Sequence, residues 1–289
     1  MTISRREFIR YSAIAAGSAV LFPELLLAAN PHEEIFLKKM AFAASEGLAD
    51  KSINDVVAAI GQSFLEAPYK EHTLEVGDKE RLVVNLREFD CVTFVESSLA
   101  LARCIKLKKR TFAEYKRQLQ LIRYRGGKIN GYPSRLHYFS DWIDNNERKG
   151  IVKNVALELG GTEFVKSIDF MSTHRSSYKH LKSNRNFAAI KASEVELNAR
   201  KRYYIPKENV QAARDRILDG DIVGIATSID GLDATHTGIA FRFQGYLRLL
   251  HAPLSGGNIQ ITKRTIVDYL GQDEKRLGIF IARPQEPVA

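Results

Sequence analysis

Cysteine is scarce in this sequence of 289 residues, which holds only Cys91 and Cys104. Two thiols form at most one disulfide, so the chain is not a disulfide-stapled scaffold. Long apolar runs, internal repeats and Gly- or Pro-rich linkers are also missing, which excludes a polytopic membrane protein and a collagen-like chain. A hydrophobic share of 45% and a charged share of 27% predict an ordinary globular protein instead.

Charge of one sign is only slightly in excess, with 43 Lys and Arg residues against 34 Asp and Glu residues. The formal net charge is +9, and the basic residues are spread along the whole chain rather than gathered in a run. Dispersed basic charge is typical of a solvated surface. We therefore expect no nucleic-acid partner.

The first 29 residues have the order of features found in an export signal. Two adjacent arginines, Arg5 and Arg6, precede a weakly apolar run over 11–22, and the Leu-Ala-Ala of 27–29 offers small residues to a signal peptidase. This order resembles a twin-arginine signal, so we expect a mature protein that begins near Asn30, works in the periplasm and meets the membrane only during export. An uncleaved anchor or a cytosolic amphipathic helix is the alternative.

Apolar periodicity divides the rest of the chain into a helical first part and a β-rich last part. Helical spacing occurs in four segments, 34–46, 52–65, 90–106 and 111–121. Strand-like patterns occur in six segments, 81–86, 221–227, 236–243, 246–251, 259–262 and 278–282. The region 123–190 has few clean periods, which indicates loops and short helices over the core. We predict one α+β domain over 30–289, with N-terminal helices packed on a C-terminal antiparallel sheet.

Cys91 falls in the first turn of the helix predicted over 90–106, with Asp90 near its cap. Unpaired backbone N–H groups and the positive end of the helix dipole favour a thiolate there, and the same groups can hold an oxyanion. Cys104 lies further along the same helix, about 20 Å away, which excludes a disulfide between the two. We interpret Cys104 as core filler and Cys91 as a candidate nucleophile, against the alternative that Cys91 is one more small buried side chain.

Two histidines lie on neighbouring strands of the β-rich part. His236 begins one strand, His251 ends the next, and the two-residue turn Gln244-Gly245 joins them in a hairpin. This turn pairs residues whose numbers sum to 489, so His251 faces Gly238 and His236 lies diagonally on the same face. Such spacing suits a general base and the residue that orients it, which a cysteine nucleophile needs. A pairing with an even sum would place the two rings on opposite faces.

The segments that carry these residues resemble a known family of cell-wall hydrolases. Those around Cys91, His236 and His251 are similar to the Cys, His and polar third positions of the NlpC-type papain-like hydrolases. Residues 67–69 with 73–75, 134–143 and 203–206 resemble one branch of it, the N-acetylmuramoyl-L-alanine amidase-like family, first catalogued as a domain of unknown function. The resemblance implies a papain-like fold with helices on an antiparallel sheet or half-barrel and an insertion at about 123–190 over the active site.

The resemblance also implies an activity. It predicts an amidase that cuts the amide between N-acetylmuramic acid and L-alanine, with 1,6-anhydro-muropeptides as substrates and no metal or organic cofactor. Carried over by position, Cys91 is the nucleophile, His236 the general base and then acid, and His251 the orienting residue. The insertion would form the wall of a closed, specific pocket.

Eight further residues are candidates for substrate binding because they combine charge, hydrogen-bond donors and stacking faces. They are Tyr69, Glu96, Arg135, His137, Tyr138, Trp142, Tyr203 and Tyr204. Alternatives stay open for most of them. The alternative for Tyr138 and Trp142 is that they pack the insertion on the core. For Glu96 it is a role as a buried anchor, and for the two adjacent tyrosines a role as strand filler. For Asp233, beside Gly231, a turn role is favoured.

Three competing interpretations use the same residues. A zinc amidase would need a third ligand beside the two histidines, and His137 is the candidate, but no HExxH or Cys-x-x-Cys spacing is present. A D-glutamyl-diaminopimelate endopeptidase would use the same triad on a peptide amide. A non-catalytic cell-wall or lipid-binding module would have a Cys91 that iodoacetamide labels as slowly as an ordinary thiol.

Overall fold

The helices that come first along the chain begin at side chains that cap them. The computed structural model describes residues 30–253, 255 and 257–288, so the export signal predicted over 1–29 lies outside the described residues. Asn30, Ser52 and Thr111 accept hydrogen bonds from backbone N–H groups in the first turns of their helices. These helices are α2 (Pro31–Ser45), α3 (Ile53–Gln62) and α5 (Phe112–Arg123).

Along the chain, α4 (Cys91–Lys106) lies between α3 and α5. Asp90 and Thr93 form a capping box, in which each side chain accepts a hydrogen bond from the other residue's backbone N–H. The predicted helix start at Cys91 is therefore confirmed. Almost the whole of α4 is buried, because α3 and α5 cover its sides and the sheet packs on it.

The β-rich part forms one antiparallel sheet, and its central hairpin has the predicted register. In the described residues the sheet has eight strands, in the order β2-β3-β8-β4-β5-β6-β7 with β1 also on β8. Phe243 pairs with Tyr246 and Ile239 with Leu250, so the pairing sum of 489 is confirmed. Both turn residues, Gln244 and Gly245, have positive φ, at 52° and 79°, as tight hairpin turns require. The strands are β1 (Val152–Asn154), β2 (Thr162–Glu163), β3 (Tyr203–Pro206), β4 (Ile222–Thr227), β5 (Ala234–Phe243), β6 (Tyr246–His251), β7 (Gln260–Ile261) and β8 (Arg276–Pro284).

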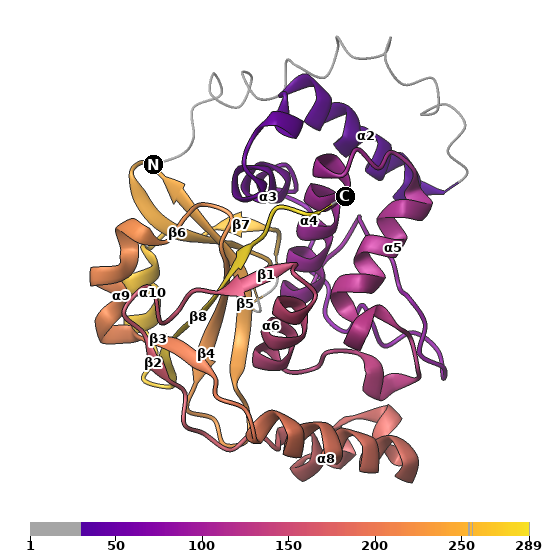
Figure 1. The fold of residues 1–289 in the computed structure, drawn as a ribbon, viewed down its shortest axis with the longest axis vertical. Coiled ribbons are helices and arrows are strands. Elements are labelled where there is room, and N and C mark those ends of the chain that lie inside the picture. The colour runs from indigo at the N-terminus through magenta and orange to yellow at the C-terminus, as the bar shows by residue number, and fades with distance from the viewer. Residues whose placement is uncertain (1–29, 254, 256, 289) are drawn as a thin grey trace.

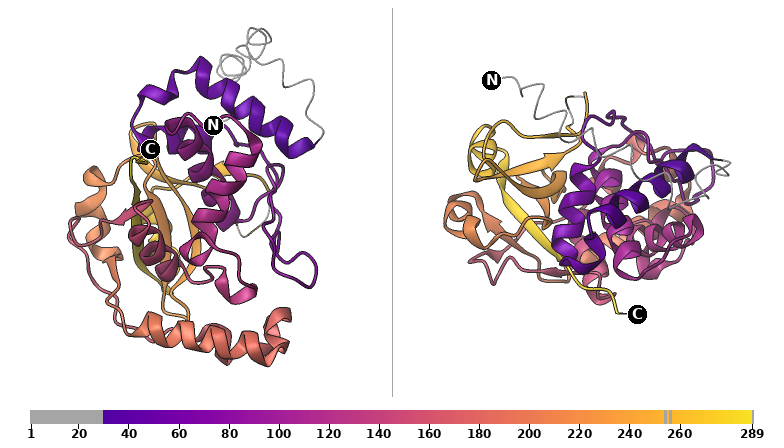
Figure 2. Two further views of the ribbon diagram at one scale, coloured as in Figure 1. Left: turned by 45° about the vertical axis from the view of Figure 1, so that its right-hand side comes forward. Right: turned by 90° about the horizontal axis from the view of Figure 1, so that it is seen from above.

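Helices cover both faces of this sheet (Figures 1 and 2). The larger core lies between the sheet and α2 to α6, and a smaller core lies under α9 and α10 on the opposite face. The remaining helices are α6 (Phe139–Arg148), α7 (Phe170–Thr173), α8 (Asn184–Asn198), α9 (Lys207–Ala213) and α10 (Ile266–Gly271). The predicted α+β architecture, helices packed on an antiparallel sheet, is confirmed.

The prediction of a strand over 81–86 is wrong. Two side chains of the α5 region take up its backbone carbonyls: Arg123 donates to Val83 O at 2.6 Å and Tyr124 Oη donates to Arg81 O at 3.0 Å. The segment is therefore held in an irregular path without a strand partner. The alternation of apolar residues reflected half-burial against helices rather than pairing in a sheet.

The region 123–190 contributes more regular structure than predicted. It contains α6, α7 and the start of α8, a helix of fifteen residues, and its strands β1 and β2 extend the main sheet. Strands of two or three residues are too short for a visible alternation, which explains why the sequence did not indicate them. The region therefore both covers the core and completes the sheet.

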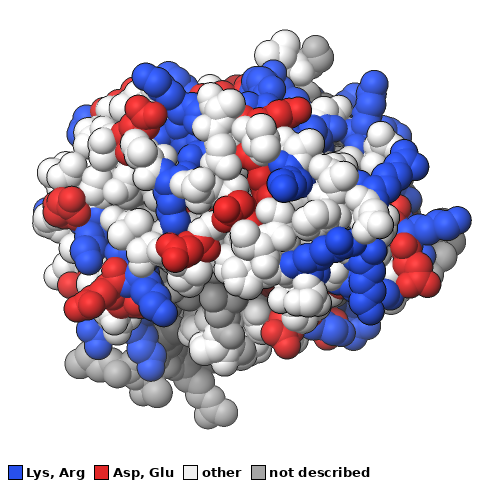
Figure 3. All heavy atoms as spheres, turned by 90° about the horizontal axis from the view of Figure 1, so that it is seen from below, with Lys and Arg blue, Asp and Glu red and all other residues white. Residues whose placement is uncertain are grey.

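The surface and the helices of the described residues have two properties that bear on partners. Viewed from below, acidic and basic side chains alternate over the surface (Figure 3). In the described residues, no helix combines the length and apolarity needed to cross a bilayer.

Candidate active site

The cysteine lies where the start of α4 meets strand β5 of the sheet. The Asp90 carboxylate accepts hydrogen bonds from Thr93 N at 2.7 Å and Thr73 Oγ1 at 2.7 Å, which fixes the start of α4. Cys91 is 9% exposed, and it lines a cavity of about 110 Å³ together with His236 and Thr237 of β5. The thiol is thus buried but not sealed, and a histidine lines the same cavity.

The hairpin joins the two histidines as its register predicts. His236 Nε2 and His251 Nδ1 are 2.7 Å apart, and the rings meet edge to face at 79°. The other ring nitrogen of His236, Nδ1, is buried and has no hydrogen-bond partner among the described residues. If Nδ1 is to accept a proton, Nε2 must carry the hydrogen and donate it to His251. The pair therefore has the geometry of a base held by an orienting residue.

Burial sets the charge state of these three groups. It raises the pKa of Cys91 to about 12, with a further increase from the Asp90 carboxylate, and the backbone N–H groups of Thr237, Cys91 and Val92 lower the pKa only in part. The N–H groups of the helix start thus favour the thiolate, as the sequence predicts, but desolvation outweighs them. Slow alkylation of Cys91 at neutral pH thus no longer separates a binding module from an enzyme.

The histidines are held neutral by the same effect. Burial lowers the pKa of His236 to about 3, aided by His251 and by Arg276, and lowers the pKa of His251 to about 4, aided by Arg276. At pH 7 the site thus holds a neutral thiol and two neutral imidazoles. A nucleophilic thiolate requires proton transfer to His236 within the cavity.

Two residues behind the histidine pair were not indicated by the sequence. The ring of Tyr269, on α10, lies 6.2 Å from that of His251 at an interplanar angle of 78°. The guanidinium of Arg276, at the start of β8, lies 4.0 Å from the centre of the Tyr269 ring. Arg276 is the cation that lowers the pKa of both histidines. Neither residue belongs to a recognisable motif, and only tertiary folding brings them to the site.

Four of the predicted substrate-binding residues line the cavity, namely Glu96, His137, Tyr138 and Trp142. Each is also engaged within the protein. Glu96 forms a buried ion pair with Arg123 at 2.6 Å, and His137 Nε2 donates to Tyr132 O at 3.0 Å. Tyr138 Oη donates to Glu194 Oε1 at 2.7 Å, and Trp142 stacks on Phe139 at 7°. These side chains build the cavity wall. The contacts support the alternative that Tyr138 and Trp142 pack against the core and that Glu96 is a buried anchor.

Three predicted residues do not line the cavity. The Arg135 guanidinium is directed to Glu75 and lies 3.9 Å from Glu80, so two carboxylates already neutralise it. Tyr203 and Tyr204 lie on β3, where each pairs with a residue of β2. The structure thus places these three residues outside the cavity that holds the thiol. It supports the alternative that Tyr203 and Tyr204 are ordinary residues of a strand.

Tyr69 lies at the edge of the site. Its backbone N–H donates to Gly257 O at 2.7 Å, and its side chain is half-buried. Its backbone pairs with Phe89, two residues before Cys91. Burial and then the charges of Cys91 and Asp90 raise the pKa of the Tyr69 phenol. The Tyr69 hydroxyl, like those of Tyr203 and Tyr204, has no hydrogen-bond partner in the part of the chain that the structure describes, but Tyr69 alone of the three lies beside the start of α4.

The loop before β5 is held at both ends. Asp233 accepts hydrogen bonds from Ser140 N at 2.6 Å and Ser140 Oγ at 2.7 Å, so it ties the loop to the first turn of α6 rather than only making a turn. The Lys166 ammonium donates to the carbonyl oxygens of Thr227, at the end of β4, and of the loop residues Ile229 and Leu232. Sequence reasoning missed Lys166, which fixes one wall of the cavity.

Fold and cavity together define the class: an α+β protein with a thiol and a hydrogen-bonded imidazole pair lining one cavity. The family model described as N-acetylmuramoyl-L-alanine amidase-like matches residues 59–279. The chain belongs to this family. No curated protein matches it.

The chain is also similar to solved structures. A structure named as an N-acetylmuramoyl-L-alanine amidase from Bacteroides uniformis is 38% identical, with a TM-score of 0.76, and the match covers 81% of this chain and 99% of that one. One named a putative xylanase from Bacteroides fragilis is 39% identical, with a TM-score of 0.74 over 78% and 99% of the two chains. A Legionella pneumophila protein, 19% identical with a TM-score of 0.67 over 89% and 96%, shares the fold.

Proposed function

We propose that this protein is a cysteine amidase of the papain-like, NlpC type that hydrolyses the amide between N-acetylmuramic acid and L-alanine in peptidoglycan fragments, with 1,6-anhydro-muropeptides as substrates. The observation that carries the proposal is the hydrogen-bonded pair of histidines, with His236 Nε2 at 2.7 Å from His251 Nδ1. His236 lines the same cavity as Cys91, and its other ring nitrogen, Nδ1, has no hydrogen-bond partner among the described residues. The family and the neighbour named as such an amidase supply the bond that is cut.

The proposed reaction starts from neutral groups. His236 Nδ1 accepts the thiol proton as the Cys91 sulfur attacks the lactyl carbonyl, while Nε2–H donates to His251 Nδ1. The N–H groups of Cys91, Val92 and Thr237, which already lower the pKa of the thiol, supply donors for the negative charge. His236 then protonates the nitrogen of the departing L-alanine, leaving a thioester. Water, deprotonated by His236, hydrolyses the thioester and restores the thiol.

The cavity is small for its proposed substrate. A volume of about 110 Å³ is well below the range of roughly 300–1,000 Å³ that encloses a whole drug-sized ligand. The cavity therefore accommodates the reacting amide and its immediate neighbours, while the rest of the muropeptide extends past the rim.

The competing carbohydrate activity, taken from the neighbour named a putative xylanase, finds less support. Glycoside hydrolysis uses two carboxyl groups that face the scissile bond. The cavity has two lining carboxylates, but Glu96 is paired with Arg123 and Asp233 accepts hydrogen bonds from Ser140. Neither is free to protonate a glycosidic oxygen.

Product analysis tests the proposal. Purified protein is incubated with anhydro-muropeptides, and mass spectrometry identifies the products. The amidase releases an intact stem peptide with a free L-alanine amine, and it leaves the sugar with a lactyl carboxylate. A shortened stem still attached to sugar would indicate the endopeptidase, a cut glycosidic bond would indicate a glycosidase, and unchanged substrate would favour the binding module.

We also propose periplasmic location through the twin-arginine signal of residues 1–29, a compartment where peptidoglycan fragments are available. Replacing both Arg5 and Arg6 by Lys is expected to retain the protein in the cytoplasm. Cell fractionation of a tagged chain measures this. Equal export of the variant and the parent chain would contradict the signal.

A further inference from the structure

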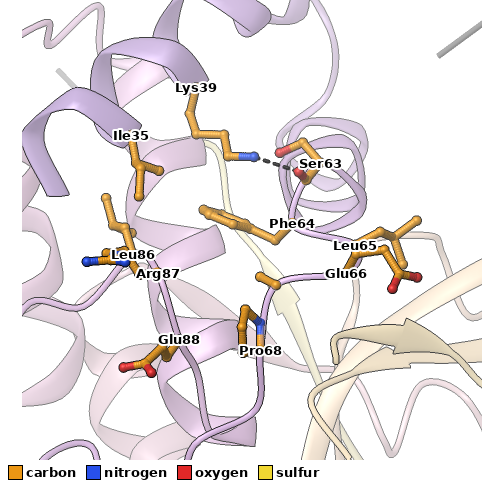
Figure 4. Close-up of a pocket in the computed structure, with 11 residues that line it drawn as sticks. Ile35, Lys39, Ser63, Phe64, Leu65, Glu66, Pro68, Leu86, Arg87 and Glu88 are labelled. Carbon is orange, nitrogen blue, oxygen red and sulfur yellow. Dashed lines mark hydrogen bonds between the residues drawn. The ribbon is translucent and has the colours of Figure 1, made fainter. Parts of the chain in front are cut away.

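A second hollow lies on the helical side of the protein, between α2 and two irregular segments (Figure 4). We call it the α2 groove; its volume is about 490 Å³, more than four times that of the catalytic cavity. Its walls come from Ile35 and Lys39 of α2, from residues 63–68 and from residues 86–88. Nothing in the proposed reaction uses it.

The α2 groove has two cations that no carboxylate neutralises. Lys39 and Arg87 form no ion pair within the described part of the chain. The two acidic residues of the lining are already engaged. Glu88 is ion-paired with Lys70 at 3.0 Å, and Glu66 accepts a hydrogen bond from Asn258 Nδ2 at 3.0 Å. The charge left for a ligand is therefore positive.

Lys39 is held in a fixed position inside the groove. Its ammonium donates to Ser63 O at 2.6 Å and lies 4.0 Å from the centre of the Phe64 ring, which projects into the hollow (Figure 4). An ammonium has three donors, and the carbonyl takes one of them. Burial lowers the pKa of Lys39 to about 8, which shows that the group lacks a compensating negative charge. A carboxylate bound here would supply that charge.

The α2 groove begins next to the catalytic cavity. Pro68 lines the groove, and the next residue, Tyr69, pairs with Phe89, two residues before Cys91. Glu88 lines the groove three residues before Cys91, so their Cα atoms are at most about 11 Å apart. An extended peptide of three residues spans about 10 Å. A ligand chain with its first amide at Cys91 can thus reach the Glu88 end of the groove, from which the groove runs past Phe64 to Lys39 (Figure 4).

We propose that the α2 groove binds the distal, carboxylate-bearing end of the stem peptide, with Lys39 and Arg87 receiving its carboxylates and Phe64 and Leu86 contacting its aliphatic parts. The inference rests on the proposed function, because it takes the substrate from it. It explains how a catalytic cavity too small for a muropeptide selects one. The stem, rather than the sugar alone, provides binding energy away from the scissile bond.

Two substrates of different stem length test this. Lys39→Met and Arg87→Ala are expected to raise KM about tenfold for anhydro-muramoyl tripeptide with little change in kcat, and to leave the turnover of anhydro-muramoyl-L-alanine unchanged. Lys38→Met is the matched control, because Lys38 is the exposed neighbour on α2, ion-paired with Glu34. Thermal unfolding of each variant verifies that it folds, and Lys39→Arg keeps the charge and is expected to restore most of the affinity.

Calorimetry separates failure of the groove from failure of the proposed function. The free tripeptide L-Ala-γ-D-Glu-diaminopimelate is titrated into Cys91→Ala protein with and without Lys39→Met. Binding that weakens about tenfold with Lys39→Met but not with Lys38→Met supports the groove even if neither substrate is turned over. Equal binding by all three proteins, or an equal loss of turnover on both substrates, overturns the inference.

Discussion

The two ends of α4 carry the two cysteines of the chain, and the contrast between them is instructive. Both thiols are buried, and burial raises the pKa of each to about 12. Cys104 is fully enclosed in the larger hydrophobic core, which agrees with its interpretation as core filler. Cys91 instead lines a cavity with His236 and lies near backbone N–H groups. A shifted thiol pKa therefore does not by itself mark a nucleophile; a neighbouring proton acceptor does.

The strongest test of this contrast is to replace each cysteine by alanine and to measure turnover. Cys91→Ala is expected to lower the release of stem peptide by at least about 10⁴-fold, because the covalent step is lost. Cys104→Ala is expected to change turnover by less than about twofold, since nothing at that end of α4 contacts the cavity. Peptide release is followed by chromatography. Turnover by Cys91→Ala at the parent rate would remove the thiol mechanism.

The orienting residue sharpens the role of the proton acceptor. His251→Ala is expected to lower kcat about 10²- to 10³-fold, because His236 loses the acceptor that fixes its tautomer. His251→Asn is expected to recover part of this loss, since the amide oxygen can accept the same hydrogen bond. Steady-state kinetics give kcat and KM separately. If Ala and Asn variants were equally impaired, His251 would have only a packing role.

The cation behind the histidines sets the pH at which the acceptor works. His236 must be neutral to take the proton, so activity rises as pH rises through its pKa, which burial, His251 and Arg276 lower. Arg276→Gln removes one of these causes, so the pKa rises and the acid limb of the pH–rate profile moves to higher pH. Activity above pH 8 is expected to change less than activity at pH 5. A uniform decrease at all pH values would indicate a structural role for Arg276 alone.

The smallest expected difference between the two alanine variants is in the free energy of unfolding. Cys104→Ala leaves a cavity in a packed core and is expected to lower the free energy of unfolding by about 1–2 kcal/mol. Cys91→Ala enlarges an existing cavity and is expected to cost less than about 0.5 kcal/mol, because catalytic groups are not optimised for stability. Urea denaturation of both variants measures this. The reverse order would mean that Cys91 is the better-packed residue.

Local signals predicted the parts of the site that local geometry determines. The cap at Asp90 and the two-residue turn at Gln244-Gly245 placed Cys91 at a helix start and both histidines on one face, and the structure confirms both placements. Arg276 and Tyr269 escaped prediction because only the packing of α10 and β8 brings them to the hairpin.

Charge state was harder to predict than position, because burial is a property of the whole fold. The helix start favours a thiolate, yet desolvation dominates the pKa of Cys91. Arg135 shows the same limit, since its sequence motif could not reveal that Glu75 and Glu80 already neutralise it. Residue types indicated the chemistry that is possible, whereas the fold decided which side chains remain available for a ligand.

Trapping the covalent intermediate tests the central claim most directly. The protein is mixed with an anhydro-muropeptide and quenched in acid within milliseconds, and intact-protein mass spectrometry with peptide mapping follows. The account predicts an adduct on Cys91 whose mass equals the sugar with its lactyl group and without any amino acid. An adduct that contains stem residues, or one on a residue other than Cys91, would contradict it.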